Sequence, residues 1–193
     1  YFEDVNFGLT KYLPTGKKIL DVGCGQGVLG EIFRKNKNEY YGIEWADDVE
    51  GMLKKRLTKY YKADVTDFKR VEMLLGKNRF DIIIFADVLE HLYDPVGIVN
   101  FYKDYLKTNG RIYISVPNIA VFNARIGLLL GKFTYTPVGT LDKTHIRFFN
   151  KENLLKLIKV TALELEKLDI TPGIARFVVP ELAGKGLLVR MFK

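Results

Sequence analysis

The sequence is poor in cysteine and histidine. It contains one cysteine, Cys24, and two histidines, His91 and His145, among 193 residues. A single cysteine excludes an internal disulfide, and this agrees with a reducing, cytoplasmic setting. Any chemistry that needs histidine must use one or both of these two positions.

Long apolar runs are also missing. No stretch approaches the ~20 residues that span a bilayer, and the longest candidate, residues 126–133, is interrupted by Gly127, Gly131 and Lys132. The sequence predicts neither a transmembrane segment nor a signal peptide. Its length and its apolar content of 48% predict one α/β domain over residues 1–193.

Acidic residues are scarce in the second half of the chain. Residues 1–100 carry 15 basic and 16 acidic side chains, whereas residues 101–193 carry 15 and 7. A basic half can attract nucleic acid, an anionic membrane surface or a phosphorylated substrate. The lysines are scattered and no run reaches five, which favours a solvated surface. A nucleic-acid partner therefore stays open but is not favoured.

A glycine-rich turn lies between an expected strand and an expected helix. Residues 18–22 form an apolar run, and glycines then alternate at Gly23, Gly25 and Gly27. Residues 28–35 follow with the apolar spacing of a helix. Glycine allows positive φ and close approach of a ligand, and a helix N-terminus offers unpaired N–H groups. The pattern predicts a loop for a nucleotide cofactor.

Two cofactor classes compete for this loop. Residues 25–30 match the dinucleotide fingerprint G-x-G-x-x-G, and Glu44 lies near the position of a ribose-binding acid. Asp21 decides against a dinucleotide, because its carboxylate would repel the pyrophosphate. S-adenosylmethionine has no phosphate and carries an ammonium and a sulfonium group, which a carboxylate attracts. We therefore predict S-adenosylmethionine rather than NAD.

The chain resembles the class I S-adenosylmethionine-dependent methyltransferases. The resemblance rests on residues 21–27 (DVGCGQG), 81–92 (DIIIFADVLEHL) and 141–149 (LDKTHIRFF). The last segment is typical of a branch similar to ubiquinone-pathway and glycan or small-molecule O-methyltransferases. The resemblance implies a single Rossmann-like, doubly wound, mostly parallel α/β sheet of about seven strands. It also implies helices on both faces and an antiparallel last strand.

The resemblance also implies a set of cofactor contacts at the ends of the strands. Glu44 would accept both ribose hydroxyls, and Asp64 would hold the adenine amino group. Trp45 would lie against the adenine edge or simply pack in the core, and Cys24 would be a small loop residue rather than a catalytic thiol. The full predicted set is Asp21, Gly23, Cys24, Gly25, Gln26, Gly27, Glu44, Trp45, Asp64, Val65 and Ala86.

Both histidines lie in segments expected to face the transferred methyl group. Methyl transfer needs an acceptor aligned with the sulfonium and, for a hydroxyl acceptor, a base. Histidine, with a pKa near ~6.5, suits this task, so we predict His145 as the base, with His91 second. Positioning without a base stays open. Arg147 would pair with an anionic group of the substrate or with Asp142.

A divalent metal is an alternative to base catalysis. Asp87, Glu90 and His91 have the i, i+3, i+4 spacing of one helical face, and His145 would complete a mixed oxygen and nitrogen set for Mg²⁺ or Mn²⁺. Small-RNA 2′-O-methyltransferases and ubiquinone-pathway O-methyltransferases have a similar arrangement. An Asp in the first position and the absence of a second downstream His depart from it. The metal ligands therefore stay undecided.

Residues 119–149 form an insertion between the fifth strand and the next helix. Its length is typical of a lid or a substrate wall, and its apolar first half is predicted to be helical. We expect that half to pack as a lid or on the core, with contact to a membrane surface as the alternative.

Several boundaries follow from local signals. We expect a leading helix over residues 1–13, with Tyr1 or Phe2 near the cofactor, and a helix over 47–57 capped by Asp47. A further helix should run from Pro95 to about Leu106. An Asn109-Gly110 turn should precede a strand over 111–116. Residues 187–192 fit either the antiparallel last strand or a helix.

These features predict a cytoplasmic S-adenosylmethionine-dependent methyltransferase. The expected acceptor is a hydroxyl of a small molecule, a glycan or a lipid-linked compound. An RNA methyltransferase and a non-catalytic cofactor-binding module are the alternatives. The sequence gives no oligomeric state.

Overall fold

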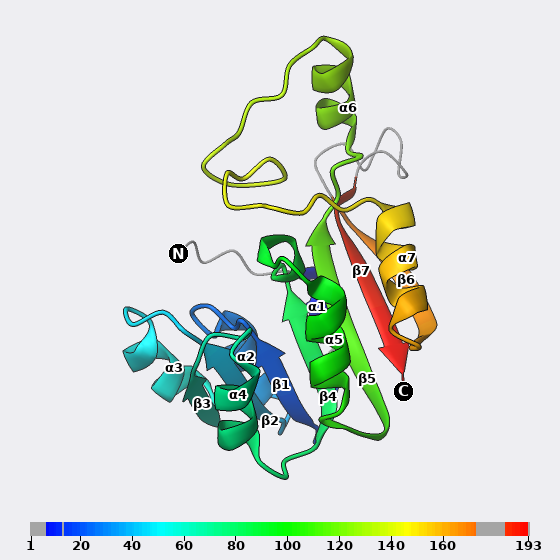
Figure 1. Cartoon of the computed structure of the whole chain (residues 1–193). Helices are drawn as coiled ribbons and strands as arrows, with labels where there is room; N and C mark the ends of the chain where they lie inside the picture. The colour runs from blue at the N-terminus through cyan, green and yellow to red at the C-terminus, as the bar shows by residue number, and fades with distance from the viewer. Residues whose placement is uncertain (1–6, 13, 173–183, 193) are drawn as a thin grey trace.

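The computed structural model describes residues 7–12, 14–172 and 184–192 (Figure 1). Seven strands form one sheet in the order β3-β2-β1-β4-β5-β7-β6. The strands are β1 (Lys18–Val22), β2 (Glu39–Glu44), β3 (Lys59–Lys62), β4 (Phe80–Ala86), β5 (Leu106–Pro117), β6 (Glu164–Pro172) and β7 (Gly184–Phe192). Neighbours from β3 to β5 pair in parallel, and β7 is antiparallel to both β5 and β6. The predicted fold class is confirmed.

Helices cover both faces of the sheet. They are α1 (Phe7–Thr10), α2 (Val28–Arg34), α3 (Glu50–Arg56), α4 (Phe68–Leu75), α5 (Pro95–Lys103), α6 (Phe122–Leu129) and α7 (Lys151–Val160), with a 3₁₀ turn η1 (Leu89–His91). Buried side chains of α4, α5 and α7 share one core cluster, and those of α1, α2 and α3 share the other. The fold is therefore three layers deep, with the sheet in the middle.

The strand sequences explain this layering. Successive side chains of a strand point to opposite faces, so Ile83 and Phe85 enter one core cluster and Ile82 and Ile84 enter the other. All four are buried because β4 lies in the middle of a parallel sheet.

Local signals predicted some boundaries wrongly. The helix expected from Asp47 begins at Glu50, and Val49 is its N-cap residue. Asp47 does not cap it, because its carboxylate pairs with Lys62 of β3 instead. Asp67, Asp94 and Asn150 each cap a helix, since each side chain accepts a backbone N–H at the start of its helix.

The region between α5 and β5 also differs from expectation. Helix α5 ends at Lys103, and β5 already begins at Leu106 rather than after a turn at Asn109. The pairing register with β4 shifts between Phe80 and Ile82, and Asn109 has a φ of 61°. The Asn-Gly pair therefore forms an irregularity within the strand. Between the pairs Phe80–Leu106 and Ile82–Arg111, β4 advances two residues and β5 five, so part of β5 is unpaired with β4 without ending the ladder.

The sequence alone could not decide whether residues 187–192 form the last strand or a helix. Residues 184–192 form β7, which inserts between β5 and β6 and pairs with both along its length. Its partners come from distant parts of the chain, so no local pattern distinguishes it from a helix. The expected leading helix is present as α1, whereas the contacts predicted for Tyr1 and Phe2 lie outside the described residues.

The sheet order reverses between β1 and β4. Strands β2 and β3 lie on one side of this point and β5 on the other. In open α/β sheets, ligands bind beyond the carboxyl ends of the strands at such a switch point. The glycine loop follows β1 and η1 follows β4, so both predicted halves of the site meet there.

Residues 119–149 divide into two parts with different surroundings. Helix α6 stands apart from the sheet beyond the carboxyl ends of the parallel strands (Figure 1), and Ala124 is its only buried residue. The expectation that this apolar half packs on the core is therefore wrong. Residues 142–149 instead lie against the body, since Ile119 N–H donates to the Phe149 carbonyl and Ile146 N–H donates to the Glu90 carbonyl.

Candidate active site

The glycine loop after β1 has the backbone of a tight turn. Gly23, Gly25 and Gly27 have φ values of 76°, 52° and 74°, in the left-handed region that glycine adopts without strain. The N–H groups of Gly23 and Cys24 both donate to the Ile43 carbonyl of β2, at 2.9 and 3.1 Å. The loop is therefore fixed to the neighbouring strand.

Asp21 lies at the base of this loop and is 1% exposed. The Tyr40 hydroxyl donates to its Oδ2 at 2.8 Å, and its Oδ1 has no hydrogen-bond partner among the described residues. Burial raises the pKa of Asp21 to about 7; the Tyr40 hydrogen bond lowers it and the Glu44 charge adds to the rise. A buried acid with a free oxygen is costly unless a positive group compensates it.

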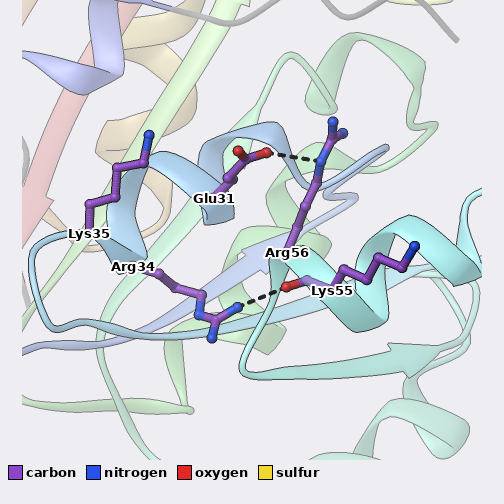
Figure 2. Close-up of a pocket in the computed structure, with 5 residues that line it drawn as sticks. All are labelled: Glu31, Arg34, Lys35, Lys55 and Arg56. Atoms are coloured by element: carbon purple, nitrogen blue, oxygen red, sulfur yellow. Dashed lines mark hydrogen bonds and ion pairs between the residues drawn. The ribbon is translucent and has the colours of Figure 1, made fainter.

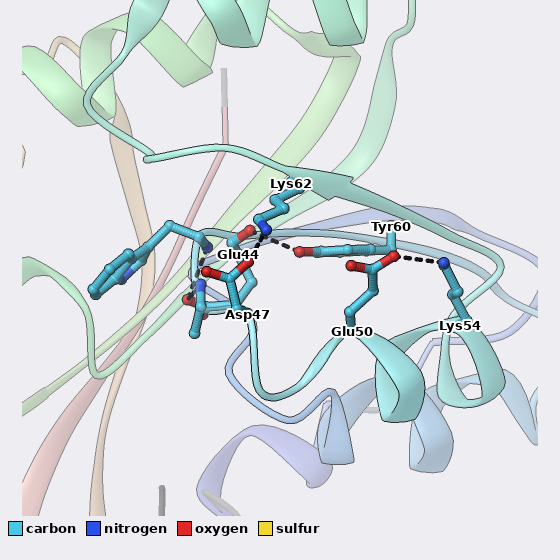
Figure 3. Close-up of polar contacts among 8 residues, drawn as sticks. Glu44, Asp47, Glu50, Lys54, Tyr60 and Lys62 are labelled. Carbon is cyan, nitrogen blue, oxygen red and sulfur yellow. Dashed lines mark hydrogen bonds and ion pairs between the residues drawn. The ribbon is translucent and has the colours of Figure 1, made fainter.

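Glu44 connects the end of β2 to the glycine loop. Its Oε2 accepts the Gly25 N–H at 2.9 Å, and its Oε1 accepts the N–H groups of Trp45 and Ala46. These three hydrogen bonds hold the side chain in place at the end of β2. Figure 3 shows Glu44 beside the Asp47–Lys62 pair, and the Tyr60 hydroxyl donates to its backbone carbonyl.

Arg56 of α3 holds the loop from the other side. Its guanidinium donates to the Gln26 carbonyl at 3.1 Å, and its Nε lies 3.1 Å from Oε2 of Glu31. Figure 2 shows this side chain in a basic cavity of about 520 Å³. None of the predicted site residues lines that cavity, whose lining residues belong to α2, its C-cap residue Lys35 and α3.

The remaining predicted cofactor residues differ in burial. Trp45 is 66% exposed, so it does not pack in the core. Asp64 is exposed, and its Oδ1 accepts the Thr66 N–H and hydroxyl. Val65 is buried, and Ala86 is half-buried at the end of β4. Burial raises the pKa of the Cys24 thiol well above its usual value, which agrees with a loop residue rather than a reactive thiol.

The two histidines meet at one point with Glu90. Their ring centroids are 4.8 Å apart, and His145 Nε2 lies 3.9 Å from Glu90 Oε1. One ligand atom from each of the three side chains lies within 4.8 Å of the others. His91 comes from η1 and His145 from the segment before α7, so residues far apart in sequence converge here.

The histidine rings are oriented by backbone carbonyls. His91 Nδ1 lies 3.1 Å from the Thr144 oxygen, and His145 Nδ1 lies 3.2 Å from the Thr140 oxygen. A carbonyl only accepts, so each ring donates from Nδ1, and a neutral ring then has its lone pair on Nε2. Burial lowers the pKa of His145, which favours this neutral form.

Glu90 is buried with no hydrogen-bond partner on either carboxylate oxygen within the described chain. Burial, and then the charge of Asp87, raises its pKa well above the usual value. Its backbone carbonyl accepts the N–H groups of both Ile146 and Arg147 at 3.0 Å. This clamp fixes the segment that carries His145 onto η1.

Two expectations for neighbouring residues need correction. Asp87 is not part of the cluster of ligand atoms, because η1 begins only at Leu89 and Asp87 itself has a φ of 53°. Arg147 does not pair with Asp142; its guanidinium donates to the Tyr93 carbonyl. Asp142 instead accepts the N–H and hydroxyl of Thr144.

The glycine loop and the histidine cluster are adjacent. A Cβ placed on Gly23 would lie 2.8 Å from a Val88 methyl group, directly before η1. Sequence reasoning missed Tyr40 and Arg56, which hold Asp21 and Gln26. A tyrosine within a strand and an arginine within a helix carry no local signal of such a contact.

Comparison with known proteins agrees with this arrangement. A family model described as a methyltransferase domain matches residues 1–168. The chain belongs to this methyltransferase family. The assignment confirms the resemblance and the predicted class, and the comparisons give no support to an RNA acceptor.

Several relatives of this methyltransferase domain carry the same name, ubiquinone biosynthesis O-methyltransferase. The ubiquinone biosynthesis O-methyltransferase of Idiomarina loihiensis is 30% identical over 155 residues, which is 77% of this chain and 62% of the relative. The chain therefore spans less than two thirds of that relative's length.

Solved structures share the fold at low sequence identity. A methyltransferase from Archaeoglobus fulgidus superposes with a TM-score of 0.73 at 16% identity, covering 97% of this chain and 92% of that one. A second solved structure is the 1,6-didemethyltoxoflavin-N1-methyltransferase of Burkholderia thailandensis with bound S-adenosylhomocysteine. Its TM-score is 0.66 at 15% identity, and the match covers 97% of this chain and 75% of that one.

Proposed function

We propose that this methyltransferase uses S-adenosylmethionine and transfers its methyl group to a hydroxyl of a small-molecule acceptor. The observation that carries the proposal is the contact between the glycine loop after β1 and the segment after β4 that bears the histidine cluster. The name of the Idiomarina relative, an O-methyltransferase, supports the choice of a hydroxyl. Residues 1–193 would form one domain, with 119–149 on the substrate side.

Two finer statements belong to this proposal. The acceptor hydroxyl belongs to a free small molecule, a glycan or a lipid-linked compound. The enzyme works in the cytoplasm, as the single cysteine suggests.

The residues at the ends of the first three strands hold the cofactor. Glu44 already lies fixed against the loop and accepts the ribose hydroxyls. Asp21 offers its free Oδ1 and a compensating negative charge to the cationic end of the cofactor. Trp45 and Val65 border the adenine, and Asp64 accepts from its amino group. The neighbouring residues Gly23–Gly27 and Ala86 provide backbone contacts.

His145 acts as the base. The cofactor supplies a methyl group on a sulfonium centre. His145 Nε2 takes the proton of the acceptor hydroxyl as the acceptor oxygen bonds to the methyl carbon and the carbon–sulfur bond breaks toward sulfur. The Thr140 carbonyl keeps the ring in the tautomer that can accept this proton. His91 packs edge-on against His145 and limits its rotation.

The same cluster has the donors of a divalent metal site. Glu90 brings an unpartnered buried carboxylate, and His91 and His145 present Nε2 atoms whose Nδ1 partners are backbone carbonyls. Carbonyl-anchored histidines are typical of metal ligands, and a mixed oxygen and nitrogen set suits Mg²⁺, Mn²⁺ or Zn²⁺. A metal held by these three residues would occupy the Nε2 lone pair of His145, so it would replace His145 as the base; it would lower the pKa of a bound hydroxyl and fix its position.

Calorimetric titration tests the cofactor assignment. S-adenosylhomocysteine and S-adenosylmethionine should bind with micromolar affinity, NAD should not bind, and Asp21→Ala and Glu44→Ala should abolish the binding. Binding of NAD in place of the adenosyl ligands would overturn the assignment.

A panel of hydroxyl acceptors tests the chemistry. His145→Ala should lower kcat by about 10²- to 10⁴-fold without weakening S-adenosylhomocysteine binding. Chelation followed by titration with Mg²⁺, Mn²⁺ or Zn²⁺ separates the metal from the metal-free form, with Glu90→Gln as the variant that removes a donor. Absence of turnover with every acceptor, despite intact cofactor binding, would favour the non-catalytic module.

A further inference from the structure

We propose that the basic cavity at α2 and α3 binds the polyphosphate group of a small molecule, and that this ligand weakens cofactor binding at the glycine loop. The cavity has a volume of about 520 Å³ and is lined by Glu31, Arg34, Lys35, Lys55 and Arg56 (Figure 2). This volume lies within the range of ~300–1,000 Å³ that is typical of small-molecule sites. The site itself does not depend on the proposed function, whereas its effect on cofactor binding rests on it.

The charge of the basic cavity favours an anion with several negative charges. Basic side chains are common in the last turn of a helix, because they offset the partial negative charge there. Here α2 and α3 bring four of them to one cavity, with Glu31 as the one acidic residue of the lining. Lys35 and Lys55 are exposed, and neither ammonium group has an acidic partner among the described residues. The excess of positive charge attracts a polyanion.

The guanidinium group of Arg34 provides donors of the right geometry. Its Nη1 donates to the Lys55 carbonyl at 3.0 Å, which satisfies a carbonyl at the end of α3 and orients the side chain. An arginine has five N–H donors in a planar fork that matches phosphate oxygens. The described residues that line the cavity are all charged, so no aromatic ring stacks against a nucleotide base. Recognition therefore depends on the phosphate groups.

A free small molecule fits this cavity better than a nucleic acid or a lipid headgroup does. Nucleic acid is bound along a stripe of basic residues, whereas these side chains gather around one cavity. Proteins that lie on a bilayer insert apolar side chains beside their basic ones, and no apolar residue is among those that line the cavity. Among the described residues, no helix is long and apolar enough to cross a membrane.

Arg56 connects the basic cavity to the glycine loop. Its Nη1 donates to the Gln26 carbonyl, and its Nε lies 3.1 Å from Oε2 of Glu31. A phosphate that contacts one edge of the guanidinium through two nitrogens uses Nη2 together with either Nε or Nη1. The ion pair with Glu31 is stronger than the hydrogen bond to a neutral carbonyl, so the phosphate competes with Gln26 for Nη1. The loop then loses one of its fixed points and binds the cofactor more weakly.

Calorimetric titration with inorganic triphosphate tests the site. This probe contains no adenosine that could enter the cofactor site, and a metal-free buffer excludes an effect through a divalent ion. The wild-type chain should bind triphosphate at least about tenfold more tightly than inorganic phosphate, and high salt should weaken the binding. GTP and UTP should bind within about threefold of each other, because the phosphate groups are recognised rather than the base.

Charge variants show whether triphosphate binds at this cavity. Lys35→Gln with Lys55→Gln should weaken its binding at least about tenfold. The control Lys69→Gln with Lys77→Gln removes two lysines that are exposed elsewhere and should change the binding by less than about twofold. Glu31→Gln should strengthen the binding about threefold or more, because it removes the negative charge of the lining. Circular dichroism and thermal unfolding show that each variant is folded.

Titration with S-adenosylhomocysteine at saturating triphosphate tests the coupling. Its affinity should fall about three- to tenfold, the loss that removal of the Arg56 contact produces. S-adenosylhomocysteine should weaken triphosphate binding by the same factor, because coupling between two sites is reciprocal. In Arg56→Ala, triphosphate should no longer change the affinity for S-adenosylhomocysteine. Lys35→Gln with Lys55→Gln should bind S-adenosylhomocysteine alone as the wild type does.

Several outcomes would overturn the proposal. Failure of the wild-type chain to bind triphosphate, or an equal loss in the Lys69 and Lys77 control, would remove the site. Tighter binding of a single-stranded oligonucleotide or of phosphatidic acid vesicles, at equal phosphate concentration, would assign the cavity to a nucleic acid or a lipid instead. Unchanged affinity for S-adenosylhomocysteine at saturating triphosphate would remove the coupling. If triphosphate binds as expected while S-adenosylhomocysteine does not bind at all, the site is supported and the proposed function fails.

Discussion

At the scale of single residues, the site depends on buried polar groups held by partners from neighbouring elements. Asp21 and Glu90 are each 1% exposed, and each has at least one carboxylate oxygen without a hydrogen-bond partner among the described residues. Such groups reduce the stability of the empty protein. A ligand that supplied the missing partner would offset this cost, and under the proposed function Asp21 belongs to the cofactor half of the candidate site and Glu90 to the acceptor half.

The raised pKa of Asp21 predicts a dependence of stability on pH. Its pKa rises from 3.8 to about 7 on folding, first through burial. The folded protein therefore binds the Asp21 proton more tightly than the unfolded chain does. The contribution of this proton to the free energy of unfolding is complete below pH ~4 and is lost as the pH rises through about 7. The measurement is urea unfolding without ligand. Between pH 6 and pH 8.5 the free energy of unfolding of the wild type should fall by on the order of 1 kcal/mol more than that of Asp21→Asn.

Tyr40→Phe provides the matched comparison. It removes the hydrogen bond that lowers the pKa of Asp21, so the loss of stability should move to higher pH. A wild-type profile parallel to that of Asp21→Asn across this range would contradict the prediction.

Arg56 predicts a coupling between α3 and cofactor affinity. Arg56→Ala removes the donor to the Gln26 carbonyl and the ion pair with Glu31. Because the loop then loses one of its fixed points, S-adenosylhomocysteine should bind about three- to tenfold more weakly in calorimetry. Arg34→Ala is the control, since Arg34 lines the same basic cavity but donates to Lys55. Equal losses in both variants would refute a specific role for Arg56.

At the scale of elements, the sequence predicted those helix and strand bounds that depend on residues close together in the chain. The bounds of β1 and the start of α5 at Pro95 agree with expectation, because an apolar run and a helix-starting proline act within a few residues. The start of α3 was wrong because Asp47 finds Lys62 on another strand. The convergence of Glu90, His91 and His145 needed the fold, since the spacing of one helical turn suggested Asp87 instead.

Two helical glycines give a test of packing between elements. A Cβ on Gly30 of α2 would lie 2.1 Å from Leu57 and 2.9 Å from Tyr40, whereas a Cβ on Gly51 of α3 would meet nothing within 4 Å. Gly30→Ala should therefore destabilise the protein by about 1–3 kcal/mol. Gly51→Ala should stabilise it by up to about 1 kcal/mol, because alanine favours helix. Denaturant unfolding measures both, and equal effects would contradict this account of packing.

Asp142 tests whether the segment with His145 must be ordered for catalysis. Its carboxylate accepts the N–H and hydroxyl of Thr144, whose carbonyl holds His91. Asp142→Ala should lower kcat about tenfold or more with S-adenosylhomocysteine affinity unchanged. Asp67→Ala removes a comparable cap from α4 and should cost about 1 kcal/mol of stability without changing kcat. A fall in cofactor affinity in the Asp142 variant would mean that the segment supports the cofactor loop instead.

At the scale of the whole molecule, the packed core and α6 are separate parts of the chain. Both core clusters consist of the sheet and the helices that cover it, and within α6 only Ala124 is buried. The sequence predicted an insertion of functional character at residues 119–149. It could not reveal that residues 142–149 join the site while α6 remains exposed, because the clamp between Glu90 and residues 146 and 147 is a tertiary contact.

This separation predicts the effect of replacing most of α6. In this variant a flexible Gly-Ser linker of equal length replaces residues 125–131. Val121, Ala124 and Phe133 stay in place. Because exposed side chains add little to folding stability, the midpoint of thermal unfolding should change by less than about 4 °C, equivalent to about 1 kcal/mol. S-adenosylhomocysteine affinity should stay within about twofold, since the loop and Glu44 lie on other elements. A large fall in the midpoint would mean that α6 supports the core, and a loss of cofactor affinity would mean that it closes over the cofactor.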